Sequence, residues 1–140
     1  MEWKEGQYRI STDKSLLSID KVCELISKSY WASKRPREVI IKSIDNSICY
    51  GVYCNEEQIG FGRIITDFAT TYYLCDVILD EKYQGIGLGK KLVECMIKSE
   101  GFCSMTGILI TQDAHGLYHQ YGFIKDEKVF MRRNPIEVLV

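Results

Sequence analysis

The sequence has 140 residues and is 46% hydrophobic, which is enough for one compact domain with a substantial core, so we expect a single domain over residues 1–140. Eighteen basic and nineteen acidic residues leave a formal charge of −1, which excludes a global basic field for holding nucleic acid or an anionic membrane. We therefore expect a small-molecule or peptide ligand, with no nucleic acid and no membrane as partner. No apolar run reaches the roughly 18 residues of a membrane span and no signal-peptide pattern is present, which predicts a cytoplasmic protein.

The cysteines form no CxxC pair and lack the histidine spacing of a zinc site, so we expect free thiols and no metal. Several fall in apolar runs, where cysteine behaves as a small hydrophobic residue. The six are Cys23, Cys49, Cys54, Cys75, Cys95 and Cys103.

The first third of the chain predicts two helices separated by a loop. Apolar residues recur at helical spacing over residues 16–30, which is typical of an amphipathic helix. Pro36 suits the first turn of a second helix, because the missing N–H of proline is not needed there. Residues 31–34 are expected to form an exposed loop between them.

Three strands are expected next. Residues 48–54 and 58–66 are rich in β-forming residues and predict a hairpin. Residues 72–79 are almost continuously apolar, which is typical of a central strand covered on both faces. Asp76 is the exception within that strand.

A glycine-rich turn follows at residues 84–90, and an apolar face over residues 88–99 predicts a helix that Gly101 can end. The remaining predicted elements are a short strand at 108–111, a short helix at 113–121, a last strand at 129–132 and a loose tail from Asn134.

Two common phosphate-binding patterns fail on the glycine-rich turn. A dinucleotide fingerprint needs G-x-G-x-x-G, but the third glycine arrives one residue early, at Gly89. A P-loop needs a glycine where Gln84 stands, and Lys91 replaces the serine or threonine that would bind magnesium. Without a gap, however, Gln84, Gly87 and Gly89 resemble the coenzyme-A signature Q/R-x-x-G-x-G/A of the GNAT acetyltransferase superfamily.

A second motif supports this resemblance. Ala114, the pair Leu117-Tyr118 and the pair Gly122-Phe123 match, in order and distance, the short helix and following strand start of the same superfamily. Two motifs at the right separation make the resemblance far more specific than either motif alone.

The resemblance implies an α/β (α+β) fold with a mixed, mostly antiparallel central sheet flanked by helices, a splayed central strand, and a coenzyme-binding core over about residues 72–123. It also implies acetyl-CoA as co-substrate, without a metal. The expected function is the transfer of an acetyl group to a primary amine of a small molecule or peptide by direct attack. A module that binds coenzyme A or acetyl-CoA without catalysis is the alternative.

In such proteins the glycine turn cradles the coenzyme pyrophosphate, because glycine lets backbone N–H groups approach closely and the following helix presents its positive end. The splayed strand exposes backbone to the pantetheine arm, and the N–H of Val77 or Leu79 becomes the expected oxyanion donor. The residues so implied in coenzyme binding are Val77, Ile78, Leu79, Gln84, Gly85, Ile86, Gly87, Leu88, Gly89, Lys90 and Tyr118.

Tyr118 matches the superfamily's general acid, and a tyrosine with a reference pKa near 10 keeps its proton at neutral pH. An aromatic side chain that merely packs its helix is the alternative. For the general base we expect Asp76, since burial in an apolar strand raises the pKa of a carboxyl group; a structural carboxylate stays open. Asp67, His115 and His119 are further candidates.

Two positions depart from the superfamily pattern. Thr111 stands where many members carry an asparagine, which puts an amide contact to the pantetheine arm in doubt. Tyr73 stands where some members place a catalytic glutamate, so the base cannot be carried over. A covalent route through Cys75 or Cys103 lacks a histidine partner at a recognisable spacing.

For the acceptor we expect Trp31 to supply an apolar wall, Arg35 a carboxylate clamp, and Asp67 a polar contact. A helix packing corner at residues 30–36 and a solvated turn at Asp67 are the alternatives. An exposed final strand is compatible with a homodimer formed by edge pairing.

Overall fold

The computed structural model describes residues 1–99 and 101–135. A six-stranded sheet forms its centre, and the strands lie side by side in their chain order. Neighbouring strands run antiparallel, except that the last two are parallel. The strands are β1 (Glu2–Glu5), β2 (Tyr8–Ser11), β3 (Ile48–Cys54), β4 (Glu57–Thr66), β5 (Thr71–Leu79) and β6 (Thr106–Ile108).

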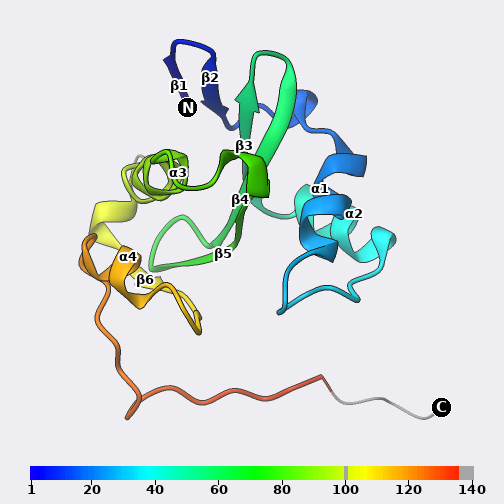
Figure 1. Cartoon of the computed structure of the whole chain (residues 1–140). Helices are drawn as coiled ribbons and strands as arrows, with labels where there is room; N and C mark the ends of the chain where they lie inside the picture. Colours follow the sequence, from blue (N-terminus) through cyan, green and yellow to red (C-terminus); the bar gives the residue numbers. More distant parts are fainter. Residues whose placement is uncertain (100, 136–140) are drawn as a thin grey trace, which may run out of the picture.

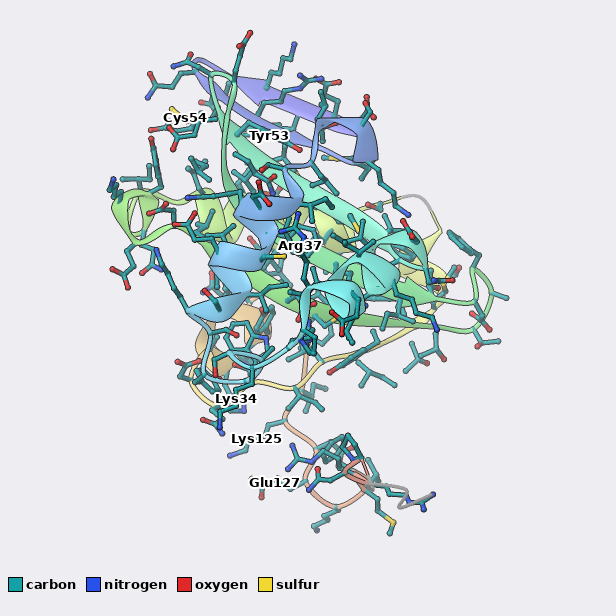
Figure 2. The ribbon with its side chains drawn as sticks, turned by 90° about the vertical axis from the view of Figure 1, so that its right-hand side faces the viewer. Lys34, Arg37, Tyr53, Cys54, Lys125 and Glu127 are labelled. Atoms are coloured by element: carbon teal, nitrogen blue, oxygen red, sulfur yellow. The ribbon has the colours of Figure 1, made fainter. Side chains whose placement is uncertain are left out.

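Helices cover both faces of this sheet. The first two, α1 and α2, lie on one face, and α3 and α4 lie on the other (Figure 1). Figure 2, turned by 90°, shows α1 and α2 in front of the strands. The α-helices are α1 (Ile19–Ser27), α2 (Arg37–Asp45), α3 (Leu88–Ile97) and α4 (His115–His119), and the short 3-10 helices are η1 (Lys14–Leu16), η2 (Glu81–Tyr83) and η3 (Phe102–Ser104). The predicted fold class, a mostly antiparallel sheet flanked by helices, is confirmed.

An apolar cluster fills each side of the sheet. Leu92 and Met96 of α3 are fully buried together with Ile64 of β4. On the opposite face, Val22 of α1 and Phe61 of β4 are also fully buried. Because each fully buried side chain of this kind contributes about 1.5–3 kcal/mol, these two clusters fix both pairs of helices onto the sheet.

The first two helices begin slightly later than the sequence pattern suggests. The Ser18 side chain accepts a hydrogen bond from the Lys21 backbone N–H, so α1 begins at Ile19 and the residues before it form η1 instead. Pro36 stands at the N-cap of α2 rather than inside its first turn. Pro36 therefore ends the loop that joins α1 to α2.

The strand β5 carries one extra residue where it passes β4. Gly62 of β4 faces two residues of β5, Asp76 and Val77, whereas the neighbouring positions are paired one to one. Asp76 has a φ of 54°, in the left-handed region that aspartate tolerates better than most residues. This β-bulge splays the middle of the strand, and bulges of this kind re-aim side chains.

The bulge changes which β5 side chains share a face. Leu74 and Val77 both pack on the α3 side, although they are three residues apart, and Ile78 packs against the α1 side. Since strand side chains otherwise alternate with a period of two, the extra residue absorbs this change of phase. Asp76 consequently lies on the same side of the sheet as the loop between α1 and α2.

The end of the described chain differs from the sequence prediction. The segment 129–132 was expected to be a strand, but none is formed among the described residues after Phe123. This segment leaves the body of the protein (Figure 1), and Val129 and Met131 are 76% and 95% exposed. The strand prediction was wrong because β-forming residues make a strand only where another strand lies beside them. Likewise β6 occupies residues 106–108 rather than 108–111, where it lies beside the start of β5.

Among the described residues, no helix combines the length and apolar character that crossing a bilayer requires.

Candidate active site

The glycine turn connects β5 to α3 through η2, and its shape depends on two glycines. Gly85 and Gly87 have φ values of 80° and 90°. A Cβ atom added to either would meet no other atom within 4 Å, so the backbone angle and not crowding calls for glycine. The turn therefore leaves open space above its backbone.

The start of α3, beside that space, has backbone N–H groups with no acceptor among the described residues. The first backbone hydrogen bond of the helix runs from the Lys91 N–H to the Gly87 carbonyl oxygen at 3.0 Å, and Gly87 offers no side chain as a cap. The N–H groups of Leu88, Gly89 and Lys90 precede that bond. Together with the positive end of the helix dipole, they form a site suited to an anion such as a pyrophosphate.

Two side-chain hydrogen bonds hold the turn in place. Gln84 Nε2 donates to the carbonyl oxygen of Leu79 at 3.2 Å, which ties the turn to the end of β5. Tyr121 donates its hydroxyl to the carbonyl oxygen of Lys90 at 3.2 Å, which ties the start of α3 to the end of α4. Ile86, within the turn, is 56% exposed.

The middle of β5 is open on the side away from β4. The strand β6 pairs with β5 only over Thr71 to Tyr73. Beyond Tyr73, no described strand lies against that edge, and the bulge at Asp76 and Val77 follows directly. The half-buried segment Val77–Leu79 therefore has exposed backbone next to the glycine turn, which is the placement that a thioester arm would need.

Tyr118 lies on α4, whose position Thr111 supports. Thr111 Oγ1 accepts a hydrogen bond from the Ala114 N–H at 3.1 Å, just before the helix begins. Tyr118 is 8% exposed, and its ring packs edge-on against Phe123 at 6.0 Å between centroids. Burial, aided by the negative charge of Asp113, raises the pKa of Tyr118 to about 12. At neutral pH this hydroxyl keeps its proton and is able to give it to a departing thiolate.

Asp76 is held by an ion-pair cluster and not by apolar surroundings alone. Its Oδ2 atom accepts from Arg35 Nη1 and from Arg63 Nε, each at 2.8 Å, and its Oδ1 atom accepts from Trp31 Nε1 at 3.4 Å. The side chain of Asp76 is 2% exposed. Arg63 Nη1 also donates to Ser47 Oγ at 3.0 Å.

The prediction of a raised Asp76 pKa was wrong. Burial acts in that direction, but the hydrogen bonds and charges of Arg35 and Arg63 outweigh it and lower the pKa of Asp76 below its ordinary value. A carboxylate that is bound by two guanidinium groups is a poor proton acceptor. Asp76 is therefore the structural carboxylate that the sequence had left open as an alternative, not the expected base.

Asp67 is also placed differently from expectation. Its Oδ1 atom accepts from the N–H groups of Ala69, Thr70 and Thr71, and its Oδ2 atom accepts from the Thr70 hydroxyl at 2.7 Å. The Thr70 hydroxyl and these N–H groups lower the pKa of Asp67. The strand from Thr71 to Val77 spans about 20 Å, so the exposed Asp67 lies too far from the bulge to contact an acceptor there. It stabilises the β4–β5 turn.

The loop between α1 and α2 contacts both β5 and the segment before α4. Trp31 contacts Asp76 on β5, while the hydroxyl of Tyr30 accepts from the Gln112 N–H at 3.3 Å, in the segment before α4. The rings of Tyr30 and Trp31 meet edge to face at 5.0 Å. The predicted acceptor residues Trp31 and Arg35 are thus brought together with the bulge, whereas Asp67 is not.

Sequence reasoning missed Arg63. Arg63 had a detectable signal: β4 and β5 are neighbouring apolar strands, and each carries one charged residue in its buried interior, Arg63 and Asp76, whereas Glu57 stands at the exposed start of β4. Two opposite charges in adjacent buried strands are expected to pair, since a buried charge is costly without a partner. Tyr30 lay in the stretch 30–36 that was expected beside the acceptor, but its hydrogen bond with Gln112 was not predicted.

The remaining candidates lie apart from this cluster. His115 and His119 are exposed at the two ends of α4, and no described residue hydrogen-bonds to either side chain. Burial raises the pKa of Cys75 to about 12, which keeps its thiol protonated and unreactive. Cys103 is exposed on η3. Among the described residues, no group of three or more histidine, cysteine or acidic side chains could hold a metal ion.

Known proteins resemble this chain over most of its length. The family described as “Acetyltransferase (GNAT) domain” matches residues 45–125. The crystal structure of a “putative acetyltransferase belonging to the gnat family” from Xanthomonas campestris is 32% identical, covers 94% of this chain and 96% of its own, and has a TM-score of 0.87. A “Putative acetyltransferase” of Gibberella zeae is 28% identical over 150 residues, which cover 91% of this chain and 85% of that protein.

A more distant likeness concerns the fold alone. A GNAT family acetyltransferase from Elizabethkingia anophelis, solved with acetyl-CoA bound, is 20% identical, covers 87% of this chain and 80% of its own, and has a TM-score of 0.65. The family match extends over more than half of the chain and includes the bulge, the glycine turn and α4. This chain belongs to the GNAT acetyltransferase family.

Proposed function

We propose that this protein uses acetyl-CoA as co-substrate and transfers its acetyl group to a primary amine of a small molecule or peptide by direct attack. The observation that carries the proposal is the start of α3, where three unsatisfied N–H groups face an open turn built on two positive-φ glycines. This arrangement suits a pyrophosphate, and it lies next to the splayed edge of β5. The acetyl-CoA complex of the Elizabethkingia fold relative is consistent with it.

Residues 84–90 would hold the pyrophosphate through their backbone, with the Lys90 ammonium group adding charge beside the phosphates. The backbone of Val77–Leu79 would line the pantetheine arm. The N–H of Val77 or Leu79 is the proposed donor to the oxyanion, since both residues lie where no described strand pairs with this edge of β5.

Tyr118 is the proposed general acid. When the tetrahedral intermediate collapses, the C–S bond breaks and the electron pair passes to sulfur, which takes the Tyr118 proton. A Tyr118 pKa of about 12 keeps that proton in place over the whole physiological range. The amine must lose its own proton before attack, and since Asp76 is bound to two arginines, we propose that water carries this proton away. The nitrogen loses a second proton to water as the amide forms, and water returns a proton to the Tyr118 oxygen.

Calorimetric titration with acetyl-CoA tests the proposal. We expect the native protein to bind, and we expect Gly87→Asp to bind at least about 100-fold more weakly, because its carboxylate repels the pyrophosphate. Gly101→Asp is the matched control: Gly101 also has a positive φ of 88°, but it follows the opposite end of α3. This control should bind like the native protein.

The outcomes separate three cases. Binding by the native protein and the control, with thiol release in the presence of amines, supports the enzyme. Binding without turnover over a broad amine panel would favour a non-catalytic module that holds acetyl-CoA. Absence of acetyl-CoA binding in the native protein would overturn the proposal.

A further inference from the structure

One buried carboxylate serves two guanidinium groups beside the β5 bulge. Asp76 Oδ2 accepts from both Arg35 and Arg63 at 2.8 Å. Neither arginine has an ion pair with any other described carboxylate. Two positive charges and one negative charge leave this cluster with a net charge of +1 in a half-buried place, where such an excess is costly.

Arg35 is the more accessible of the two guanidinium groups. The side chain of Arg63 is 10% exposed, and both its Nε and its Nη1 atoms have partners. Arg35 is 23% exposed and uses only Nη1, so its Nε and Nη2 atoms have no partner among the described residues. Arg35 is therefore anchored at one nitrogen, and its other two nitrogens are left as donors; a guanidinium group binds planar anions through such paired donors.

Arg35 is bound next to the segment that would carry the proposed reaction. Asp76 directly precedes Val77, whose Cα is about 3.8 Å away along the chain. Trp31, which also contacts Asp76, is 45% exposed and adds an apolar surface to the same loop. An acceptor that places its amine near Val77 would thus place a neighbouring group near Arg35.

We infer that the acceptor is an amine that also carries an anionic group, and that Arg35 binds this group with its remaining donors. The inference rests on the proposed acetyltransferase function. A carboxylate or a phosphate offers the paired oxygens that the guanidinium fork requires. An anion would neutralise the excess charge of the cluster, whereas a polyamine would add to it. The substrate class is therefore an amino acid or an amine of similar anionic character.

A purely structural role of Arg35 makes a different prediction. If Arg35 served only to attach the loop to Asp76, its loss would weaken turnover of every amine alike. If Arg35 binds the acceptor, its loss affects only the amines that carry an anion. Matched acceptors decide between the two.

The experiment measures kcat and KM with acceptors that differ in one group. Phenylalanine is compared with its amide and with 2-phenylethylamine, and phosphoethanolamine with ethanolamine. For at least one pair we expect kcat/KM to favour the anionic member by roughly 10- to 100-fold, as expected for charge-assisted hydrogen bonds. The carboxylated and phosphorylated members show which anion is bound.

Arg35→Gln should abolish this preference through an increase in KM for the anionic acceptor, while kcat/KM for the neutral partner changes by less than about 3-fold. Arg35→Lys retains the charge and should keep part of the preference, even if the glutamine variant folds poorly. Lys34→Gln is the control, since Lys34 lies on the same loop (Figure 2) and is exposed. It should behave like the native protein.

Equal or better turnover of neutral amines by the native protein would overturn the inference, and so would an equal loss for all acceptors in Arg35→Gln. These results leave the proposed function standing as long as acetyl-CoA binds. Failure of acetyl-CoA to bind counts instead against the proposed function, and the inference falls with it.

Discussion

The Asp76 cluster lies in β5 and the glycine turn follows the end of that strand, yet the two are built in opposite ways. The turn consists of seven consecutive residues, 84–90, and works through backbone angles and N–H groups. The cluster works through side chains and joins residues that are 41 and 13 positions apart in the sequence. We conclude that the proposed coenzyme side is specified locally, whereas the proposed acceptor side exists only after the fold has assembled.

The largest expected effect concerns the stability of the cluster. Asp76→Ala leaves Arg35 and Arg63 without a counter-charge in a mostly buried place, so the free energy of unfolding should fall by about 3–5 kcal/mol. Urea unfolding measures this loss. Asp76→Asn is the control, because asparagine keeps the size and tolerates a positive φ, and it should lose less. A fully stable Asp76→Ala would show that the cluster contributes little to the fold.

A smaller effect is expected at the proposed acid. Tyr118→Phe should lower kcat by about 10²-fold, because the departing thiolate loses its proton donor. Since the Tyr118 pKa is about 12, the native rate should not fall between pH 7 and about pH 10 through loss of this proton. His119→Gln on the same helix should keep native turnover. Unchanged kcat in Tyr118→Phe would show that Tyr118 is not the general acid and only packs its helix.

Low pH should reduce the stability that the Asp76 cluster provides, but not the backbone contacts of the glycine turn. The folded-state pKa of Asp76 is lowered, so the stability it adds is present above the unfolded pKa of about 3.9 and is lost as the pH falls through the lower folded value. Unfolding followed by circular dichroism between pH 6 and pH 2 should show a steeper loss in the native protein than in Asp76→Asn. If stability fell equally with pH in the native protein and in Asp76→Asn, Asp76 would not be a source of the acid sensitivity.

The smallest effect is expected at Asp67, which belongs to neither region. Asp67→Asn should change kcat/KM by less than about 2-fold, because its bonds all lie within the turn between β4 and β5. A large rise in the acceptor KM would restore the original expectation that Asp67 contacts the acceptor.

The difference between features set by short segments and features set by distant residues explains how much of the structure the sequence could predict. The order of strands and helices around the glycine turn was predictable, because glycine spacing and apolar periodicity are properties of short segments. The bulge was not, because it is defined by the register between β4 and β5 and by an unusual φ at Asp76. A sequence pattern contains neither quantity.

Charge provided partial information about the candidate site. Asp76 stood out as a carboxylate in an apolar strand, but the direction of its pKa shift depended on Arg35 and Arg63, which fold onto it from other elements. The expectation considered burial alone and so had the wrong sign. The segment 129–132 failed for a related reason, since its β-forming composition does not specify a neighbouring strand.

Asp76 combines two duties that are usually divided among residues, since it sets the backbone of the bulge and also holds the loop that carries Trp31 and Arg35. For protein engineering this makes Asp76 a poor position at which to change acceptor preference, because any replacement disturbs the bulge and the loop at once. Libraries that keep Asp76 and vary residues 31–35 should yield folded variants far more often. Evolution within the family would face the same constraint and would be expected to diversify the loop first.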